Sequence, residues 1–444
     1  MARLFGTDGV RGVANTELTC DLAFKLGQAA VAFKGKTILI GKDTRLSGDM
    51  LESAVAAGIM SMGGTALLAG IIPTPAIALL VRDLHCDGGI VISASHNPPE
   101  YNGIKIFDGQ GFKLPDAMED EIEAFVARGG AAADELPAGD AVGVALPVED
   151  ACERYIAHAV DTVAREGIRF DGLRVALDVG HGASCMTSAE ALRRLGAEVV
   201  AINEDFDGTD INVECGSTHL EPLRQLVAES GADVGIAHDG DADRVMLVDA
   251  QGAEIDGDVV EAVCALDLKQ RGLLAGNTAV STVMCNLGLS HALRDAGIDL
   301  IQTKVGDRYV LEAMREGGYV IGGEQSGHMI FLEHNSTGDG LVTALQFLAA
   351  CVRADKTAGE AAAVMTRFPQ TLINVRVQDK HAVEGNAAVE AAVAAAEAEL
   401  GENGRVLLRP SGTEPVVRVM VEASDPAEAD RHAKAIAAVV EREV

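Results

Sequence analysis

Basic and aromatic residues are scarce in this sequence. Its 444 residues include 36 lysines and arginines against 67 aspartates and glutamates, which gives a formal net charge of −31. Tryptophan is absent, and only four tyrosines and eleven phenylalanines are present. Binding to nucleic acid or anionic membrane needs basic surface, and single-strand binders also stack bases on aromatic rings. The composition therefore argues against both partners, and we interpret the acidity as a soluble, self-repelling surface.

Paired cysteines and long apolar runs are also missing. The eight cysteines are scattered and form no CxxC pair, which predicts reduced, buried thiols and no disulfide framework. The N-terminus, MARLFGTDGVRG, carries charges and glycines where a secretion signal has an apolar segment. No stretch approaches the ~18 apolar residues of a membrane span. These absences predict a cytoplasmic protein.

Three stretches of the chain share one pattern, in which a strand-like segment is followed by a turn, a helix-like segment and a second strand. They cover residues 36–70, 173–203 and 277–306. Such alternation predicts βαβ units on parallel sheets, with ligands beyond the carboxyl ends of the strands. The tail has strand-like segments followed by helix-like ones, which predicts a smaller α+β domain. With roughly 150 residues per domain as a guide, we place the domains at 1–150, 151–250, 251–366 and 367–444.

The segment HDGDADR, residues 238–244, follows a strand-like run and carries Asp239, Asp241 and Asp243 at alternate positions. In an extended loop this spacing points the three carboxylates the same way. Converging carboxylates repel one another unless a hard cation lies among them. An EF-hand is excluded because its sixth and twelfth positions would be Arg244 and Ala250. The segment predicts a metal site with a phosphoryl ligand; the alternative is an acidic turn that caps the next element.

The segment RPSGTEPVVR, residues 409–418, combines hydroxyl, glycine and guanidinium groups in one turn. Glycine lets the backbone approach an anion, and arginine offers a bidentate fork to phosphate oxygens. The segment indicates a phosphate site, and a plain polar hairpin is the alternative. Its candidate ligands are Arg409, Ser411, Gly412, Thr413 and Arg418.

The segment GGEQSGH, residues 322–328, lies between two strand-like runs. Glu324 and Ser326 offer hydrogen bonds to sugar hydroxyls or an amino group, and His328 offers proton transfer. A solvated β-turn is the alternative.

The segment SASHNPPEYNGIKIF, residues 93–107, places Ser93, Ser95 and His96 in one turn and Lys105 on the strand after it. No GxSxG elbow accompanies the serines, so a hydrolase nucleophile is not indicated. A phosphoserine at position 95 would need a metal and a cation, which the aspartates and Lys105 would supply. Capping of the turn is the alternative role for both serines.

Together with the N-terminal FGTDGVRG, these four segments, in this order, resemble the α-D-phosphohexomutase superfamily. The resemblance covers the whole chain, with one of the four segments in each of the superfamily's four domains. It implies an α/β fold of three similar mixed α/β domains and a smaller C-terminal α+β domain around a central active-site cleft. Gln325, HMIFLEHNSTGDG and KVGDRYV resemble the branch that acts on glucosamine phosphates.

The resemblance implies a role for each candidate residue. Ser95 would carry the catalytic phosphoryl group and Ser93 would not. One Mg²⁺ per chain would be held by a phosphate oxygen on Ser95 and by Asp239, Asp241 and Asp243. Glu324 and Ser326 would contact the sugar, and the 409–418 segment would hold its far phosphate. The residues that would line the reaction centre are Arg11, His96, Lys105, Arg244 and His328. Of these, Lys105 and His328 would be suited to proton transfer.

The activity that the resemblance implies is interconversion of glucosamine 6-phosphate and glucosamine 1-phosphate, toward UDP-N-acetylglucosamine and peptidoglycan. It would proceed through phosphoserine and glucosamine 1,6-bisphosphate, or a similar bisphosphate, which also primes the enzyme. The alternatives are a mutase for mannose or glucose phosphates, a Mg²⁺-dependent sugar-phosphate phosphatase and a non-catalytic sensor. Whether the chain forms a homodimer stays open.

Overall fold

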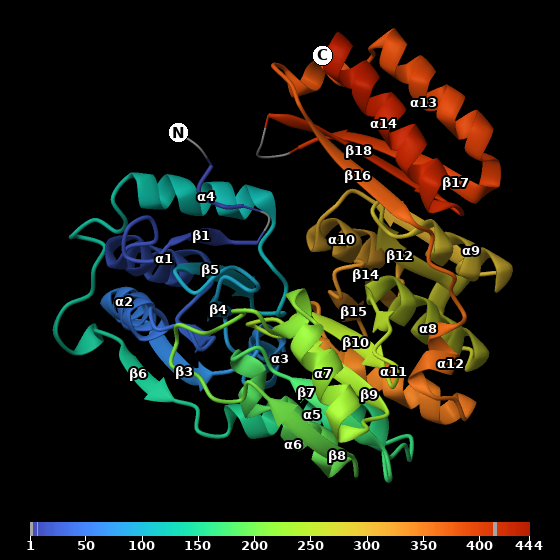
Figure 1. Ribbon diagram of the computed structural model, residues 1–444. Coiled ribbons are helices and arrows are strands. Elements are labelled where there is room, and N and C mark those ends of the chain that lie inside the picture. The colour runs from blue at the N-terminus through green and yellow to red at the C-terminus, as the bar shows by residue number, and fades with distance from the viewer. Residues whose placement is uncertain (1–2, 7, 412–414) are drawn as a thin grey trace. The chain divides into compact units, whose positions relative to one another are not determined.

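The computed structural model describes residues 3–6, 8–411 and 415–444, and the chain divides into two compact units (Figure 1). The first unit comprises Met1–Met284 and Ile298–Val364, and the second comprises Cys285–Gly297 and Met365–Val444. Three β-sheets belong to the first unit and one belongs to the second.

The first sheet has six strands, in the order β1-β5-β4-β2-β3-β6. They are β1 (Val10–Val13), β2 (Thr37–Lys42), β3 (Thr65–Ile71), β4 (Gly88–Ile92), β5 (Tyr101–Asp108) and β6 (Val144–Pro147). Its helices are α1 (Cys20–Phe33), α2 (Gly48–Ser61), α3 (Thr74–Asp83) and α4 (Asp116–Ala127). Strands β2, β3, β4 and β6 are parallel, whereas β5 pairs antiparallel with both β4 and β1. The predicted first βαβ unit is thus confirmed as β2, α2 and β3.

The second sheet has five strands, in the order β11-β10-β9-β7-β8. They are β7 (Arg174–Asp178), β8 (Glu198–Ile202), β9 (Val234–His238), β10 (Val245–Asp249) and β11 (Glu254–Ile255). The helices of this region are α5 (Ala151–Ala164), α6 (Ser188–Arg194) and α7 (Glu221–Ser230). Strands β7, β8 and β9 are parallel, and β10 returns antiparallel to β9.

The third sheet has four strands, in the order β13-β12-β14-β15. They are β12 (Thr278–Thr282), β13 (Asp299–Thr303), β14 (Ile321–Gly323) and β15 (Met329–Phe331). Its unit also contains α8 (Gly257–Gln270), α10 (Asp307–Gly317), α11 (Gly340–Ala354) and α12 (Ala358–Ala362). Strands β12, β13 and β14 are parallel, and β15 returns antiparallel to β14.

The three sheets place their polar motifs in the same way. In each, a buried strand leads into a polar turn and the chain returns on a buried antiparallel strand. The turns are residues 93–100 between β4 and β5, 239–244 between β9 and β10, and 324–328 between β14 and β15. The flanking strands are largely buried, so each hairpin presents most of its polar groups at the turn; Lys105 on β5 is an exception.

The second unit is a three-stranded antiparallel sheet with helices. Its elements are β16 (Gln370–Arg376), β17 (Gly404–Pro410), β18 (Val416–Ala423), α9 (Leu287–Asp295), α13 (Ala387–Leu400) and α14 (Pro426–Glu443). The strand order β16-β18-β17 confirms the predicted α+β class. Residues 285–297 belong to this unit because both Asn286 Nδ2 and the Leu287 N–H donate to the carboxylate of Glu422, each at 3.0 Å. The α14 N-cap is Asp425, which accepts a hydrogen bond from the Ala427 N–H at 2.9 Å.

All eight cysteines are free, as predicted, but only five are buried; Cys152 and Cys185 are half-buried and Cys20 is exposed. Burial raises the pKa of Cys86 to about 11 and that of Cys185 to about 12. In the ranges that the structure describes, no helix has both the length and the apolar character needed to cross a membrane.

Helices α1 and α2 cross at two glycines, which generates a test of the packing. A Cβ at Gly58 would lie 2.0 Å from the Phe24 carbonyl oxygen, and a Cβ at Gly27 would lie 2.2 Å from that of Val55. Because backbone atoms cannot yield, we expect Gly58→Ala to lower the free energy of unfolding by about 1 to 3 kcal/mol, despite alanine's better helix propensity. Urea unfolding measures this, with Ala57→Ser at the exposed neighbouring position as the control. Equal stability of the two variants would refute the close crossing.

Candidate active site

Ser95 lies in the turn between β4 and β5 and is 1% exposed. Its φ of +53° is in the left-handed region, which a non-glycine residue adopts only when its surroundings hold it there. The Oγ donates a hydrogen bond to Asp239 Oδ2 at 2.6 Å and lies 3.2 Å from His96 Nδ1. Ser93 Oγ accepts from the Ser95 N–H at 2.9 Å and donates to Asp43 Oδ2 at 2.6 Å. Ser95 therefore faces the 239–244 turn, called the acidic loop below, whereas Ser93 supports the turn that contains Ser95.

The three aspartates of the 239–244 turn converge, as their alternate spacing predicted. Asp239 and Asp241 are 0% exposed and Asp243 is 4% exposed. One oxygen from each lies within 4.8 Å of the others, which makes them a group that could hold a metal ion. Among the described residues, Asp241 Oδ1 and Asp243 Oδ1 are buried without a hydrogen-bond partner. Oxygen donors with free lone pairs, gathered this closely, fit a hard divalent cation.

The protein's own charges only partly balance these carboxylates. Burial, followed by the charges of Asp243 and Asp241, raises the pKa of Asp239 well above its ordinary value. Burial acts on Asp241 in the same direction, but the Lys105 ammonium outweighs it and lowers the pKa of Asp241 to about 2. The charge of Arg244 and the hydrogen bond from Ser95 compensate Asp239 only in part, and a bound cation would complete the compensation.

Lys105 reaches the acidic loop from β5, where it pairs with Val91 of β4. It is 1% exposed, and its Nζ lies 2.8 Å from Asp241 Oδ2, 3.5 Å from Asp243 Oδ2 and 3.3 Å from Asp8 Oδ2. Burial opposes its charge, but the carboxylates of Asp241 and Asp8 prevail and raise the pKa of Lys105. Lys105 is therefore a fixed positive charge beside Ser95 and the aspartates.

Three further predicted residues surround this centre. Burial, followed by the charges of Arg244 and Arg11, lowers the pKa of His96 to about 4, so the imidazole is uncharged near neutral pH. Arg244 Nε lies 3.8 Å from Asp243 Oδ1, and Arg11 pairs with Asp8. The positive charges nearest to Ser95 thus come from arginine and lysine, and His96 contributes a neutral ring.

His328 is 3% exposed, and its backbone forms an isolated antiparallel bridge with Arg244. Neither ring nitrogen has a hydrogen-bond partner among the described residues, and Nε2 lies 3.7 Å from Asp307 Oδ2. Lys113 Nζ joins Asp307 Oδ2 at 2.5 Å to Asp8 Oδ1 at 2.7 Å. Asp8, Lys113 and Asp307 are not among the residues predicted for the site. Asp8 and Asp307 lie within the motifs FGTDGVRG and KVGDRYV, whereas Lys113 carries no comparable signal.

The turn between β14 and β15 presents the predicted sugar-contacting residues. Glu324 is half-buried, with Oε1 accepting a hydrogen bond from the Gly306 N–H at 3.2 Å, and Ser326 is exposed. Gln325 Nε2 donates to Asp256 Oδ2 at 3.2 Å, so its side chain is directed to the N-terminus of α8. Glu324 also interacts electrostatically with Arg244, which links this turn to the acidic loop.

The phosphate motif at 409–418 lies in the second unit. Arg409 of β17 and Arg418 of β18 are directly opposite one another in the antiparallel pair. Burial, followed by the charge of Arg418, lowers the pKa of Arg409. Like charges directly opposite one another on paired strands destabilise the pair. Ser411 is buried. Two further predicted residues lie outside the described residues: Gly412 and Thr413.

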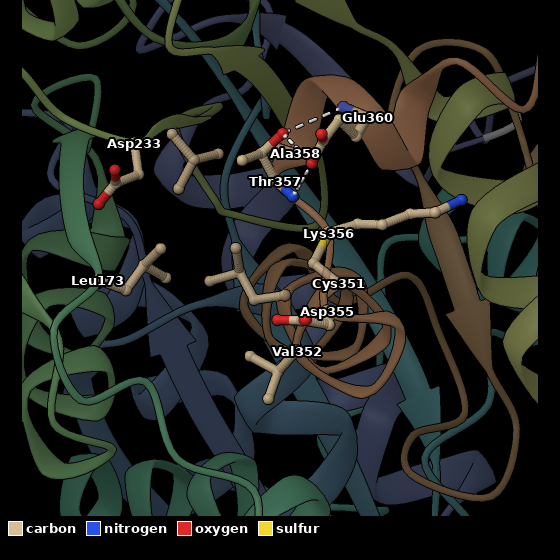
Figure 2. Close-up of a pocket in the computed structure, with 11 residues that line it drawn as sticks. Leu173, Asp233, Cys351, Val352, Asp355, Lys356, Thr357, Ala358 and Glu360 are labelled. Atoms are coloured by element: carbon tan, nitrogen blue, oxygen red, sulfur yellow. Dashed lines mark hydrogen bonds between the residues drawn. The ribbon is translucent and has the colours of Figure 1, made fainter.

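A separate cavity of about 380 Å³ lies where α11 ends and α12 begins, facing the start of β9 (Figure 2). Its lining includes apolar side chains such as Leu173 and Val352 and charged ones such as Asp233 and Lys356. In Figure 2 dashed lines mark the capping hydrogen bonds between Thr357 and Glu360. No predicted site residue is among the described residues that line it, so it is not the reaction centre.

Comparison with protein families gives a consistent result along the whole chain. Four family models described as phosphoglucomutase/phosphomannomutase match: α/β/α domain I at residues 2–132, domain II at 153–252, domain III at 256–368 and the C-terminal domain at 372–439. These matches support the four-domain fold class.

Individual relatives narrow the comparison. The phosphoglucosamine mutase of Clostridium novyi is 51% identical, over 99% of each chain. A crystal structure of a phosphoglucomutase/phosphomannomutase family protein from Burkholderia thailandensis aligns with a TM-score of 0.83 and 23% identity, over 99% of this chain and 97% of that one. The N-acetylphosphoglucosamine mutase of Aspergillus fumigatus, solved with GlcNAc-6P and magnesium, aligns with a TM-score of 0.69 and 17% identity, over 99% and 96%. The last two establish a shared fold.

The near-complete match at about half identity, together with a buried serine on a cluster of three aspartates, leads to one conclusion. The chain belongs to the phosphoglucomutase/phosphomannomutase family and, within it, to the phosphoglucosamine mutases.

Proposed function

We propose that the chain interconverts glucosamine 6-phosphate and glucosamine 1-phosphate through a phosphoryl group carried on Ser95. The observation that carries this proposal is the 2.6 Å contact of Ser95 Oγ with Asp239, inside a buried cluster that also contains Lys105. A hydroxyl held there becomes, when phosphorylated, a dianion among groups able to hold its charge.

Mg²⁺ is the cofactor that we propose for Asp239, Asp241 and Asp243, with the fourth ligand an oxygen of phospho-Ser95. Their hard oxygen donors, two of which lack hydrogen bonds within the described chain, support it. When bound, the ion neutralises charge on the phosphoryl group during transfer.

The phosphoryl group moves twice in the proposed cycle. First, a free sugar hydroxyl attacks phospho-Ser95: the new bond joins the sugar oxygen to phosphorus, and the bond to Ser95 Oγ breaks. The product is glucosamine 1,6-bisphosphate, which must turn end for end. Ser95 Oγ then attacks the other phosphate, and the bond from that phosphorus to the sugar oxygen breaks, which restores phosphoserine and releases the isomer. Lys105 and Arg244 supply positive charge in both steps, since the Lys105 ammonium and the Arg244 guanidinium stay protonated.

Proton balance assigns a task to an acid–base group. In the first step the attacking sugar hydroxyl loses a proton and the departing Ser95 Oγ gains one; in the second step the Ser95 hydroxyl loses its proton and the departing sugar oxygen gains one. A single group on the sugar side can therefore take the proton in the first step and return it in the second. His328, whose buried ring nitrogens have no partner among the described residues, suits this task. The raised pKa of Lys105 favours charge stabilisation over proton removal for that residue.

The two ends of the sugar need different contacts. Glu324 and Ser326 are our candidates for the hydroxyl and amino groups, and the facing pair Arg409 and Arg418 for the phosphate that is not reacting. Each guanidinium offers a bidentate fork to phosphate oxygens, and two forks on facing strands suit a dianion. Because either phosphate occupies this position in turn, the contacts must accept both orientations of the sugar.

A substrate panel tests the proposed specificity. We expect kcat/KM for glucosamine 6-phosphate to exceed that for mannose 6-phosphate and glucose 6-phosphate by at least about tenfold. A ratio of this size needs only a modest difference in the contacts that the two kinds of sugar make with the site. Product isomers are quantified with the phosphorylated enzyme. Preference for a 2-hydroxy sugar phosphate would favour the alternative mutase, and release of inorganic phosphate without isomerisation would favour a phosphatase.

Loss of the serine hydroxyl tests the covalent step. Ser95→Ala should lower kcat by more than about 10³-fold, because no other group can carry the phosphoryl between the two steps. Intact mass after incubation with glucose 1,6-bisphosphate should show one added phosphoryl group on the wild type and none on the variant. Ser93→Ala, which keeps the acceptor, should still be phosphorylated. Turnover of Ser95→Ala at the wild-type rate would contradict the mechanism.

Charge in the acidic loop tests the metal site. The raised pKa of Asp239 means that the folded state holds its proton more tightly than the unfolded chain, so stability without metal falls as pH rises above the ordinary aspartate pKa. We therefore expect Asp239→Asn to match or exceed the wild-type thermal midpoint in EDTA at pH 8. With Mg²⁺ at 100 times its Kd, the wild type should gain about 2.7 kcal/mol and the variant much less.

The control for this experiment is Asp205→Asn, at a side chain that is 97% exposed. It should respond to Mg²⁺ as the wild type does. An equal Mg²⁺ response of Asp239→Asn and wild type would place the metal elsewhere.

A further inference from the structure

Arg45, between β2 and α2, has a fully buried guanidinium whose ion partner is Asp43, at 3.0 Å from Nε to Oδ2. A buried guanidinium is costly unless its donors are satisfied. The other four N–H groups point at one short segment of chain. They donate to the carbonyl oxygens of Ser95 at 2.9 Å, Asn97 at 2.7 Å, Tyr101 at 3.0 Å and Pro98.

These carbonyls belong to the Ser95 turn, residues 93–100, and to the first residue of β5. The turn has no helix or strand of its own, so its carbonyl groups, that of the buried Ser95 above all, need partners from elsewhere. A planar fork with five donors can hold four carbonyls at once. Arg45 thus provides, from a separate loop, the hydrogen bonds that a sheet would otherwise provide.

Both peptide groups that flank the Cα of Ser95 are held by this network. On one side, the Ser95 N–H donates to Ser93 Oγ, and Ser93 in turn donates to Asp43, the ion partner of Arg45. On the other side, the Ser95 carbonyl accepts from Arg45 and from Asn212 Nδ2, each at 2.9 Å. With both sides held, the left-handed backbone at Ser95 is maintained, and the Oγ is directed at Asp239.

We propose that Arg45 is a positioning residue for phosphoryl transfer, which holds the Ser95 turn so that Oγ keeps one position as leaving group and as nucleophile. The inference rests on the proposed function, because it needs Ser95 to take both roles. A displacement of 1 Å at a reacting atom can cost about 10²-fold in rate. Arg45 contacts the backbone of the turn and neither Oγ nor the proposed sugar contacts, so its loss should affect transfer and leave substrate binding intact.

The test is Arg45→Lys, which retains the positive charge but cannot reach four carbonyls from one nitrogen. We expect kcat for glucosamine 6-phosphate to fall by about 10²-fold while KM changes less than about threefold. The phosphorylated variant should also lose a larger share of its phosphoryl group to water, at least about tenfold more per mutase turnover than wild type. Inorganic phosphate and sugar phosphate are measured in the same reaction.

The matched control is Arg353→Lys on α11. Arg353 likewise holds two partners through its fork, Asp267 at 2.8 Å and Glu166 at 2.6 Å, but none in the Ser95 turn. It should lose thermal stability at most and keep the wild-type kcat and phosphate partition. Arg45→Lys with the same kcat and partition as Arg353→Lys overturns the inference.

Ser93→Ala gives a second reading if Arg45→Lys does not fold. It breaks the same network at the Ser95 N–H and should lower kcat without raising KM, although Ser95 still accepts phosphate from glucose 1,6-bisphosphate. An unchanged kcat for this variant would overturn the inference as well. The wild type, measured in parallel, separates failure of this inference from failure of the proposed function. If the wild type is phosphorylated on Ser95 but does not isomerise glucosamine 6-phosphate, the proposed function is wrong. The transfer of the phosphoryl group to sugar and to water is then compared among the variants with glucose phosphates as substrates.

Discussion

Three carboxylates buried within 4.8 Å of one another are the constraint on which the rest of the first unit depends. Burial and mutual repulsion oppose their ionisation, so the fold must bring positive charge to them. Lys105 arrives from another sheet, and Ser95 Oγ and Thr74 Oγ1 donate hydrogen bonds at 2.6 Å each. The first two sheets are therefore joined by the chemistry of the site as well as by packing.

The same arrangement, a polar turn between two antiparallel strands, recurs in each sheet of the first unit. It explains how many polar side chains can be buried and still be held in fixed positions. Each turn is short and begins and ends on strands that are largely buried. Its side chains are therefore fixed by the ends of the hairpin, and the remaining backbone groups are held by neighbours such as Arg45. Rigid support of this kind is what phosphoryl transfer requires, because catalysis there consists mainly of position and charge.

Features that arise within one segment of chain could be predicted from the sequence. The alternate aspartates converge because their loop connects two adjacent strands, and β2, α2 and β3 follow the period of their apolar residues. Contacts between sheets leave no such local pattern. The ion pairs that join Asp8, Lys113 and Asp307, and the five bonds of Arg45, depend on distances set only after the sheets pack. The grouping of residues 285–297 with the second unit has the same origin, since it depends on hydrogen bonds to Glu422 across 135 residues.

The separation of the turns among different sheets also bears on how such a protein changes over evolutionary time. The 324–328 turn is held by Asp256 and Gly306 of its own region, whereas the turns at 93–100 and 239–244 belong to other sheets. Substitutions at the exposed Ser326 of the 324–328 turn can therefore accumulate with little effect on Ser95 or the aspartates, whereas Glu324 and His328 are coupled to Arg244 of the 239–244 turn. A lineage could acquire a new sugar preference by altering one hairpin and inherit the phosphoryl chemistry intact.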